Sequence, residues 1–181
     1  MQPTIRIRPA SGDDAALLYE ISRRTFYDTF AVYNTPENME LYLNHQLTAA
    51  SMAAEVADPG NLFLLAYIGD QPAGYAQLRE NHILPGPEGA SAAEPEGKPA
   101  IEIVRIYAEQ YTIGKGIGRA LMTRSLEIAR EKNKEWIWLG VWEHNQRAID
   151  FYTKWGFERF GEHTFLLGHD VQTDWEMKRM V

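Results

Sequence analysis

The chain has 181 residues, of which 45% are hydrophobic and 24% charged, a composition typical of a globular domain with a sizeable core. Its net charge of −7 argues against a nucleic-acid partner and suits a small cationic substrate. No apolar run in the sequence is long enough to cross a membrane. The sequence has no cysteine, which excludes disulfides, thiolate nucleophiles and cysteine-based metal sites.

We expect one domain over residues 1–181, because the sequence shows neither an internal repeat nor a linker that would divide it. The first residues lack the apolar segment of a signal peptide, which together with the absence of cysteine favours the cytoplasm. The five histidines are scattered, with no pair at metal-ligand spacing, so we expect no metal ion.

The N-terminal half predicts an edge strand, three helices and a β-hairpin. Residues 4–8 alternate in character and predict a strand that Pro9 stops, after which Ser11 or Asp13 can cap a helix. Thr35 before a proline is a strong helix start, and Thr48 is placed to cap a further short helix. The apolar run 62–68 predicts a buried strand that pairs, through a turn at 69–72, with a returning strand at 73–79.

Residues 82–99 are rich in Pro, Gly, Ala and Glu and predict a flexible loop. A loop of this length within a compact domain is either a functional flap or a tolerated insertion. We favour the insertion.

The centre of the chain combines a predicted strand at 101–108, glycines at 114, 116 and 118, and a predicted amphipathic helix at 118–132. Glycine lets the backbone turn tightly, and the free N–H groups at a helix N-terminus bind anions such as phosphate. The glycine spacing matches neither a dinucleotide-binding fold nor a P-loop. Two interpretations of the glycine turn remain: a phosphate-binding loop of another kind, or an ordinary structural loop.

The C-terminal third predicts a second buried strand at 136–141 and two further strands near 157–166 and 172–180. Between them, Asn145 can cap a helix that ends at Trp155 and Gly156. The predicted fold is a mixed α/β sheet with helices on both faces.

The glycine turn and the segment after it resemble the GNAT superfamily of N-acetyltransferases. The family pattern Q/R-x-x-G-x-G/A places its glycines at Gly116 and Gly118, although its first position is Ile113 instead of Gln or Arg. The family's second block, N-x-x-A-x-x-x-Y-x-x-x-G-F, matches residues 145–157. The resemblance implies a mostly antiparallel sheet whose central strands splay apart. Residues 25–30, 34–39, 137–143 and 172–174 further resemble the PaiA-type spermidine/spermine acetyltransferases of bacteria.

This resemblance implies acetyl-CoA as cosubstrate, with its pyrophosphate on the glycine loop and its pantetheine along the exposed edge of the central strand. Asn145 is also implied as a pantetheine contact. Lys115 and Arg119 can add contacts to phosphate or be ordinary solvated surface. The residues so implied are Ile106, Tyr107, Ala108, Gly114, Lys115, Gly116, Ile117, Gly118, Arg119 and Asn145.

Direct transfer of an acetyl group from a thioester to an amine needs an acid for the leaving thiolate and a base for the amine. Tyr152 is the predicted acid, because a phenol is protonated at neutral pH; the alternative is a half-buried packing residue. Glu102 is the candidate base, at the place where several GNAT enzymes have a glutamate. Alternation along the strand would put it on one face with Val104 and Ile106. The alternative is a solvated or salt-bridged residue, with Arg105 as a partner.

The expected substrate is a polyamine such as spermidine or spermine. Residues 25–30 are either core at a helix end or, by resemblance, a wall of the amine site. A polyamine site needs several spaced acids, and the candidates are Asp28, Glu37, Glu102 and Glu143. The alternatives are another small amine, a peptide amine, or a regulatory protein that binds CoA with little catalysis. A homodimer is a further possibility.

Overall fold

The computed structural model of the chain describes residues 4–81 and 99–181, so the predicted insertion at 82–99 lies outside it except for Pro99. The described strands form one seven-stranded sheet in the order β1-β2-β3-β4-β5-β7-β6. Neighbouring strands are antiparallel except for β4 and β5, which are parallel. The strands are β1 (Ile5–Pro9), β2 (Asn61–Ile68), β3 (Gln71–Asn81), β4 (Ala100–Ala108), β5 (Trp136–Trp142), β6 (Glu158–Leu167) and β7 (Asp170–Met180).

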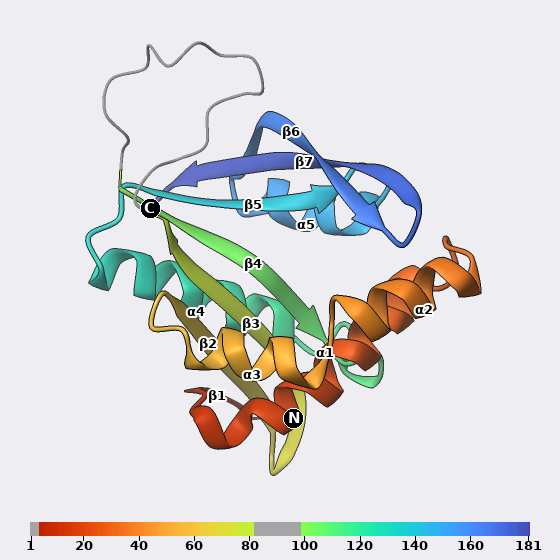
Figure 1. Cartoon of the computed structure of the whole chain (residues 1–181). Coiled ribbons are helices and arrows are strands. Elements are labelled where there is room, and N and C mark those ends of the chain that lie inside the picture. Colours follow the sequence, from red (N-terminus) through yellow and green to blue (C-terminus); the bar gives the residue numbers. More distant parts are fainter. Residues whose placement is uncertain (1–3, 82–98) are drawn as a thin grey trace.

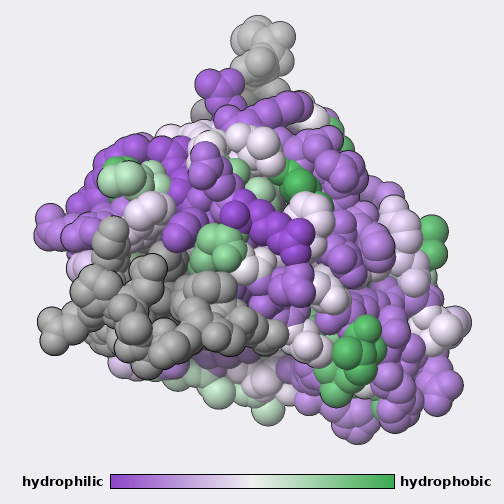
Figure 2. Space-filling view, turned by 90° about the horizontal axis from the view of Figure 1, so that it is seen from above, coloured by the Kyte–Doolittle hydropathy of each residue, from purple (hydrophilic) through white to green (hydrophobic). Residues whose placement is uncertain are grey.

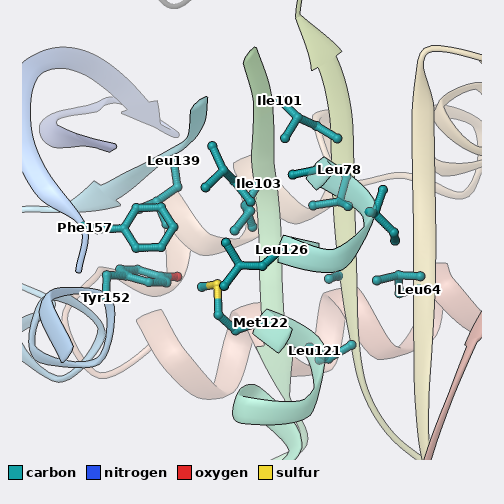
Figure 3. Close-up of a cluster of buried hydrophobic side chains, with 14 of the residues drawn as sticks. Leu64, Leu78, Ile101, Ile103, Leu121, Met122, Leu126, Leu139, Tyr152 and Phe157 are labelled. Carbon is teal, nitrogen blue, oxygen red and sulfur yellow. The ribbon is translucent and has the colours of Figure 1, made fainter. Parts of the chain in front are cut away.

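Helices cover both faces of this sheet, as expected (Figure 1). One apolar core lies between the sheet and helices α4 and α5, and a second lies between the sheet and helices α1 to α3. Figure 3 shows the first core, in which leucines of α4 pack against isoleucines of β4 and against Phe157. The helices are α1 (Ala15–Phe30), α2 (Pro36–His45), α3 (Ala49–Ala57), α4 (Ile117–Glu131) and α5 (Gln146–Lys154), with short 3-10 turns at Gly12–Asp14 and Gln110–Thr112.

Side-chain caps fix the starts of three helices where the sequence predicts them. The Thr35 hydroxyl accepts a hydrogen bond from the Asn38 N–H, and the Thr48 hydroxyl accepts one from the Ser51 N–H. Asn145 caps α5 in the same way. The first strand differs by one residue, because Pro9 is its last paired residue and not a residue beyond its end. An edge strand tolerates proline because one of its sides has no strand to bond.

The parallel strands β4 and β5 pair over only part of their length. Residues Ala100 to Ile103 pair with Trp136 to Leu139, and beyond this point the two strands separate. Figure 1 shows them starting side by side and then diverging, so that β1–β4 and β5–β7 form two halves of the sheet with an opening between them. The predicted splay of the central strands is therefore confirmed.

A bulge in β4 changes which side chains face each core. The register of β4 against β3 shifts at Val104, which is an extra residue in β4. As a result Ile103 and Ile106, an odd and an even position, pack against the same core. The prediction that Glu102, Val104 and Ile106 share one face is therefore wrong, since the bulge leaves Glu102 on the face opposite Ile106.

One face of the described structure is mostly polar. In the face shown in Figure 2, hydrophilic residues predominate and hydrophobic residues form small separate patches. Of the helices in residues 4–81 and 99–181, none is long and apolar enough to cross a membrane.

Candidate active site

A cavity of about 600 Å³ occupies the opening between β4 and β5. Residues of α1 and α2 line it on one face of the sheet, and residues of the glycine loop, α4 and α5 line it on the other. The cavity therefore passes through the sheet, and we call its two parts the loop end and the α1–α2 end. Two reactants that approach from opposite faces can meet inside it.

The glycine loop forms the wall of the loop end. Gly114 and Gly116 have φ angles of +82° and +92°, in the left-handed region that favours glycine. The first helical hydrogen bond of α4 runs from the Ala120 N–H to the Gly116 carbonyl at 2.9 Å. The N–H groups of the helical residues before Ala120 therefore have no acceptor within the helix, and they lie at the positive end of the helix dipole. This arrangement suits a phosphate group.

Two predicted cations lie outside the cavity. Lys115 and Arg119 are exposed and do not line it, and the Lys115 ammonium lies 5.9 Å from the centroid of the Tyr111 ring. Arg147, in the first turn of α5, does line the cavity. Sequence reasoning missed Arg147 because its position in the family's second block is variable.

The strand edge predicted to bind pantetheine also lines the cavity. Ile106, Tyr107 and Ala108 belong to the part of β4 beyond its pairing with β5. Asn145 lines the cavity opposite this edge, and its side-chain oxygen accepts a hydrogen bond from the Ala148 N–H at 3.2 Å. An exposed strand edge can add an extended ligand through backbone hydrogen bonds.

Tyr152 reaches the cavity from α5. Its side chain is 8% exposed, and Figure 3 shows it beside Phe157 with its hydroxyl directed toward Met122. Burial raises the pKa of the Tyr152 phenol above its ordinary value of 10.0. Its hydroxyl has no hydrogen-bond partner in the part of the chain that the structure describes. The phenol is thus neutral and able to donate a proton or a hydrogen bond.

Glu102 does not line the cavity. Its carboxylate lies 3.7 Å from the Arg79 guanidinium, which fits the alternative of a salt-bridged residue, with Arg79 as the partner in place of Arg105. Arg105 instead pairs with Glu55 of α3. The structure brings the predicted acid Tyr152 to the cavity but does not bring the predicted base there.

The α1–α2 end is mostly aromatic. Its walls come from the end of α1, from α2, from the end of β5, and from β6 and β7. The run 25–30 therefore serves as both a helix end and a cavity wall. The aromatic side chains are Phe26, Phe30, Tyr42, Trp142 and Phe165.

The carboxylates expected for a polyamine site are elsewhere. Asp28, Glu37 and Glu143, like Glu102, do not line the cavity, and Asp28 borders a separate depression beside Arg24. The described lining has one carboxylate, Asp174 of β7. Burial is the largest effect on Asp174 and raises its pKa to about 6.

Sequence reasoning missed Asp174 as a site residue. The alternation of Gln172, Asp174 and Glu176 along a strand was a usable signal, because polar residues at every second position mark one face. What the alternation could not show is that this face borders the opening between β4 and β5.

Comparison with known proteins agrees with this fold. The model of the acetyltransferase (GNAT) family matches residues 16–157. An uncharacterized N-acetyltransferase of Lactobacillus delbrueckii subsp. lactis is 36% identical over 179 residues, covering 97% of this chain and 96% of the relative. An uncharacterized N-acetyltransferase of Mycobacterium tuberculosis is 30% identical over 92% of this chain and 97% of its own length.

Solved structures share the fold. The PaiA N-acetyltransferase of Thermoplasma acidophilum, solved in complex with coenzyme A, superposes with a TM-score of 0.75 at 22% identity, covering 98% of this chain and 99% of that protein. A GCN5-related N-acetyltransferase of Rhodopseudomonas palustris gives 0.74 at 19% identity, over 100% and 98% of the two chains. The chain thus belongs to the acetyltransferase (GNAT) family, whose acetyl donor is acetyl-CoA, and is an N-acetyltransferase.

Proposed function

We propose that this chain transfers an acetyl group from acetyl-CoA directly to a primary amine inside the cavity between β4 and β5. The observation that carries the proposal is the path of the cavity through the sheet, with the glycine loop at one end and a carboxylate among aromatic rings at the other. CoA fits the loop end, because its pyrophosphate suits the N-terminus of α4 and its extended pantetheine suits the free edge of β4.

Within this proposal, backbone groups do most of the cofactor binding. The loop Gly114, Gly116, Ile117 and Gly118 offers N–H groups to the pyrophosphate, and Ile106, Tyr107 and Ala108 offer the strand edge. Asn145 borders the same space. Lys115 and Arg119, outside the described cavity wall, contribute at most long-range attraction for the phosphates.

Tyr152 is the proposed acid. As the C–S bond of the thioester breaks, sulfur gains negative charge, and a neutral phenol can protonate it. The raised pKa of Tyr152 keeps the proton on the phenol throughout the neutral range. Direct transfer needs no enzyme nucleophile, in agreement with the absence of cysteine from the sequence.

The proposed amine is a polyamine such as spermidine or spermine. The net charge of −7 and the resemblance to PaiA-type sequences support this substrate, and aromatic rings can hold ammonium groups through cation–π contacts. An amine with an apolar or aromatic body is the second candidate. It is favoured by the aromatic lining of the α1–α2 end and by the single described carboxylate there.

A steady-state panel of amines at two ionic strengths tests these substrates, with release of free CoA as the readout. A polyamine substrate predicts the highest kcat/KM for spermidine or spermine and a clear fall with salt, because screening weakens the attraction of a multiply charged ligand. The second candidate predicts the highest kcat/KM for phenethylamine or tryptamine, with little dependence on salt. CoA binding without turnover of any amine would contradict the proposed function and favour a regulatory role.

A further inference from the structure

A row of three polar side chains runs from the α1–α2 end of the cavity into β6 and β7. Asp174 lies opposite Trp142 of β5 and opposite His163 of β6 in the sheet register. Its side chain is 17% exposed and borders the cavity. Glu176 stands two residues further along β7, on the same face as Asp174.

His163 lies between the two carboxylates. Its Nε2 is 3.9 Å from Asp174 Oδ2, and its Nδ1 is 3.4 Å from Glu176 Oε1. The imidazole therefore connects the cavity carboxylate with a second carboxylate deeper in the sheet, because the Glu176 side chain is only 9% exposed. Two carboxylates on either side of a protonated imidazole attract it and can hold it in one orientation. At 3.9 Å the contact with Asp174 is longer than a hydrogen bond, so passing a proton along this row requires His163 and Asp174 to move closer together.

Two glycines make room for this row. A Cβ atom on Gly140 would lie 2.9 Å from His163 Cε1, and one on Gly161 would lie 2.5 Å from Glu176 Oε2. Real Cβ atoms do not approach so closely, so any other residue at these positions would displace the imidazole or the carboxylate. The space for the row depends on residues that have no side chain.

We propose that Asp174 binds the substrate ammonium and takes its proton, and that His163 and Glu176 are positioning residues that orient Asp174 and lead the proton away. This inference rests on the proposed function, because it assigns the base for the same amine in the same cavity. It replaces Glu102, which the cavity does not reach, in that role.

The proton balance of the reaction is then complete. The substrate ammonium has three protons on nitrogen and the amide product keeps one. The first proton goes to Asp174, which leaves a neutral amine to attack the thioester carbonyl carbon. The C–N bond forms and the C–S bond breaks, and the thiolate takes a proton from Tyr152. The nitrogen then loses its second proton, which returns through water to Tyr152, while the first leaves Asp174 by way of His163.

The charged and titratable groups around Asp174 are consistent with this role. Burial has the largest effect and raises the pKa of Asp174, His163 of β6 lowers it, and Glu143 after β5 raises it. The resulting pKa is about 6. Tyr42 of α2 also faces this part of the cavity, and Arg105 of β4 is there already paired with Glu55. A base with a pKa just below neutrality is ionised at pH 7.5 yet still accepts a proton readily.

The test compares Asp174→Asn with the natural chain, using spermidine and phenethylamine as probes. Asp174→Asn should lower kcat/KM for the better amine by about 10²–10⁴-fold while leaving the KM for acetyl-CoA nearly unchanged. The acid limb of the pH profile, near pH 6 in the natural chain, should disappear. His163→Gln should move that limb to higher pH, because His163 lowers the pKa of Asp174. Glu158→Gln, which removes an exposed carboxylate of β6 outside the cavity wall, is the matched control and should retain nearly all activity.

An Asp174→Asn enzyme that keeps its kcat/KM and its acid limb would overturn the inference while leaving the proposed function intact. If the natural chain turns over neither these probes nor any other amine of the panel, the proposed function fails, and calorimetry then tests Asp174 separately. With CoA present at pH 7.5, binding of the probe ammonium should be lost in Asp174→Asn and kept in Glu158→Gln. Equal binding to the natural chain and to Asp174→Asn would overturn the inference.

Discussion

The Arg105 guanidinium of β4 donates a hydrogen bond to the Glu55 carboxylate of α3 at 2.6 Å, and another to the Gln77 side-chain oxygen at 2.8 Å. The side chains of Arg105 and Glu55 are 19% and 23% exposed. Since Arg105 also lines the cavity, this pair neutralises a cation that would otherwise repel an ammonium substrate.

Glu55→Gln should therefore be costly. The substitution leaves the mostly buried Arg105 guanidinium without a carboxylate partner. Removing one partner of a buried ion pair lowers the free energy of unfolding by about 3–5 kcal/mol. Because the pair is partly exposed, we expect a loss in the free energy of unfolding near the lower end of that range. Urea titration measures it. Glu131→Gln breaks an exposed pair with Arg124, which solvent screens, and should cost much less. Equal losses in the two variants would contradict the argument.

Gly118→Val should weaken acetyl-CoA binding with little effect on stability. A Cβ at Gly118 would meet the Phe151 ring at an ordinary 3.7 Å, so the folded chain can accept a side chain there. That side chain would stand where the pyrophosphate is proposed to approach the helix. The KM for acetyl-CoA and the melting temperature test this pair of effects.

Gly116→Ala and Gly69→Ala separate backbone strain from ligand contact. Both glycines have positive φ, +92° and +59°, so either alanine should cost about 1–2 kcal/mol of stability. Gly69 lies in the turn between β2 and β3, away from the cavity. Only Gly116→Ala should also raise the KM for acetyl-CoA, and an unchanged KM in both Gly116→Ala and Gly118→Val would show that the loop does not hold the phosphates.

Tyr152→Phe should lower kcat by about 10²–10⁴-fold, because the leaving thiolate loses its proton donor. The KM for acetyl-CoA should stay nearly constant, since the ring remains in place. Tyr75→Phe is the control, because Tyr75 is also a buried tyrosine with a raised phenol pKa but packs in the other core, outside the cavity wall. If both variants kept full kcat in a reaction limited by chemistry, Tyr152 would be a packing residue.

Asp174→Asn should stabilise the fold at pH 7.5. The pKa of Asp174 is about 6 in the folded chain against an ordinary 3.8, so the folded state holds this proton more tightly than the unfolded state does. Stability from this group is present below pH 4 and is lost as the pH rises through 6. Ionised Asp174 therefore costs up to about 3 kcal/mol at pH 7.5, a cost that asparagine removes. Urea titrations at pH 4 and pH 7.5 should show a gain only at the higher pH.

Asp14→Asn serves as the control, because the pKa of Asp14 is shifted in the opposite direction from that of Asp174. The Arg8 guanidinium donates two hydrogen bonds to Asp14, at 2.7 and 2.8 Å, and holds the pKa of that carboxyl well below its usual range. Its contribution to stability is present above pH 4 and is lost as the pH falls. Asp14→Asn should therefore destabilise the chain at pH 7.5. The same direction of change in both variants would contradict these assignments.

Local patterns in the sequence predicted most of the fold. Thr35, Thr48 and Asn145 mark helix starts because a capping side chain bonds to backbone only three residues away. Strand positions followed from apolar runs, and the strand–loop–helix order led to the glycine loop. Tyr152 was predicted from the resemblance of residues 145–157 to the second block of the GNAT family. These features depend on neighbours close in sequence.

Features that depend on pairing between distant strands could not be predicted in this way. The bulge at Val104 exists only in the register of β4 against β3. It leaves Glu102 on the face opposite Ile106, whereas strict alternation would place the two residues on one face. Asp174, His163 and Gly140 meet because three strands lie side by side in the order β5-β7-β6. The acids expected for polyamine binding lie outside the cavity wall for the same reason. The charge of a residue does not show whether its side chain reaches the cavity.

The path of the cavity through the sheet assigns its two ends to different stretches of the chain. The loop end comes from residues between 106 and 118 and between 145 and 152, whereas the α1–α2 end draws on residues 26–42 and 165–174 and on Arg105 and Trp142. Substitutions in the second set can accumulate without disturbing the first. A lineage built on this plan can thus change the molecule it modifies while inheriting its acetyl donor unaltered.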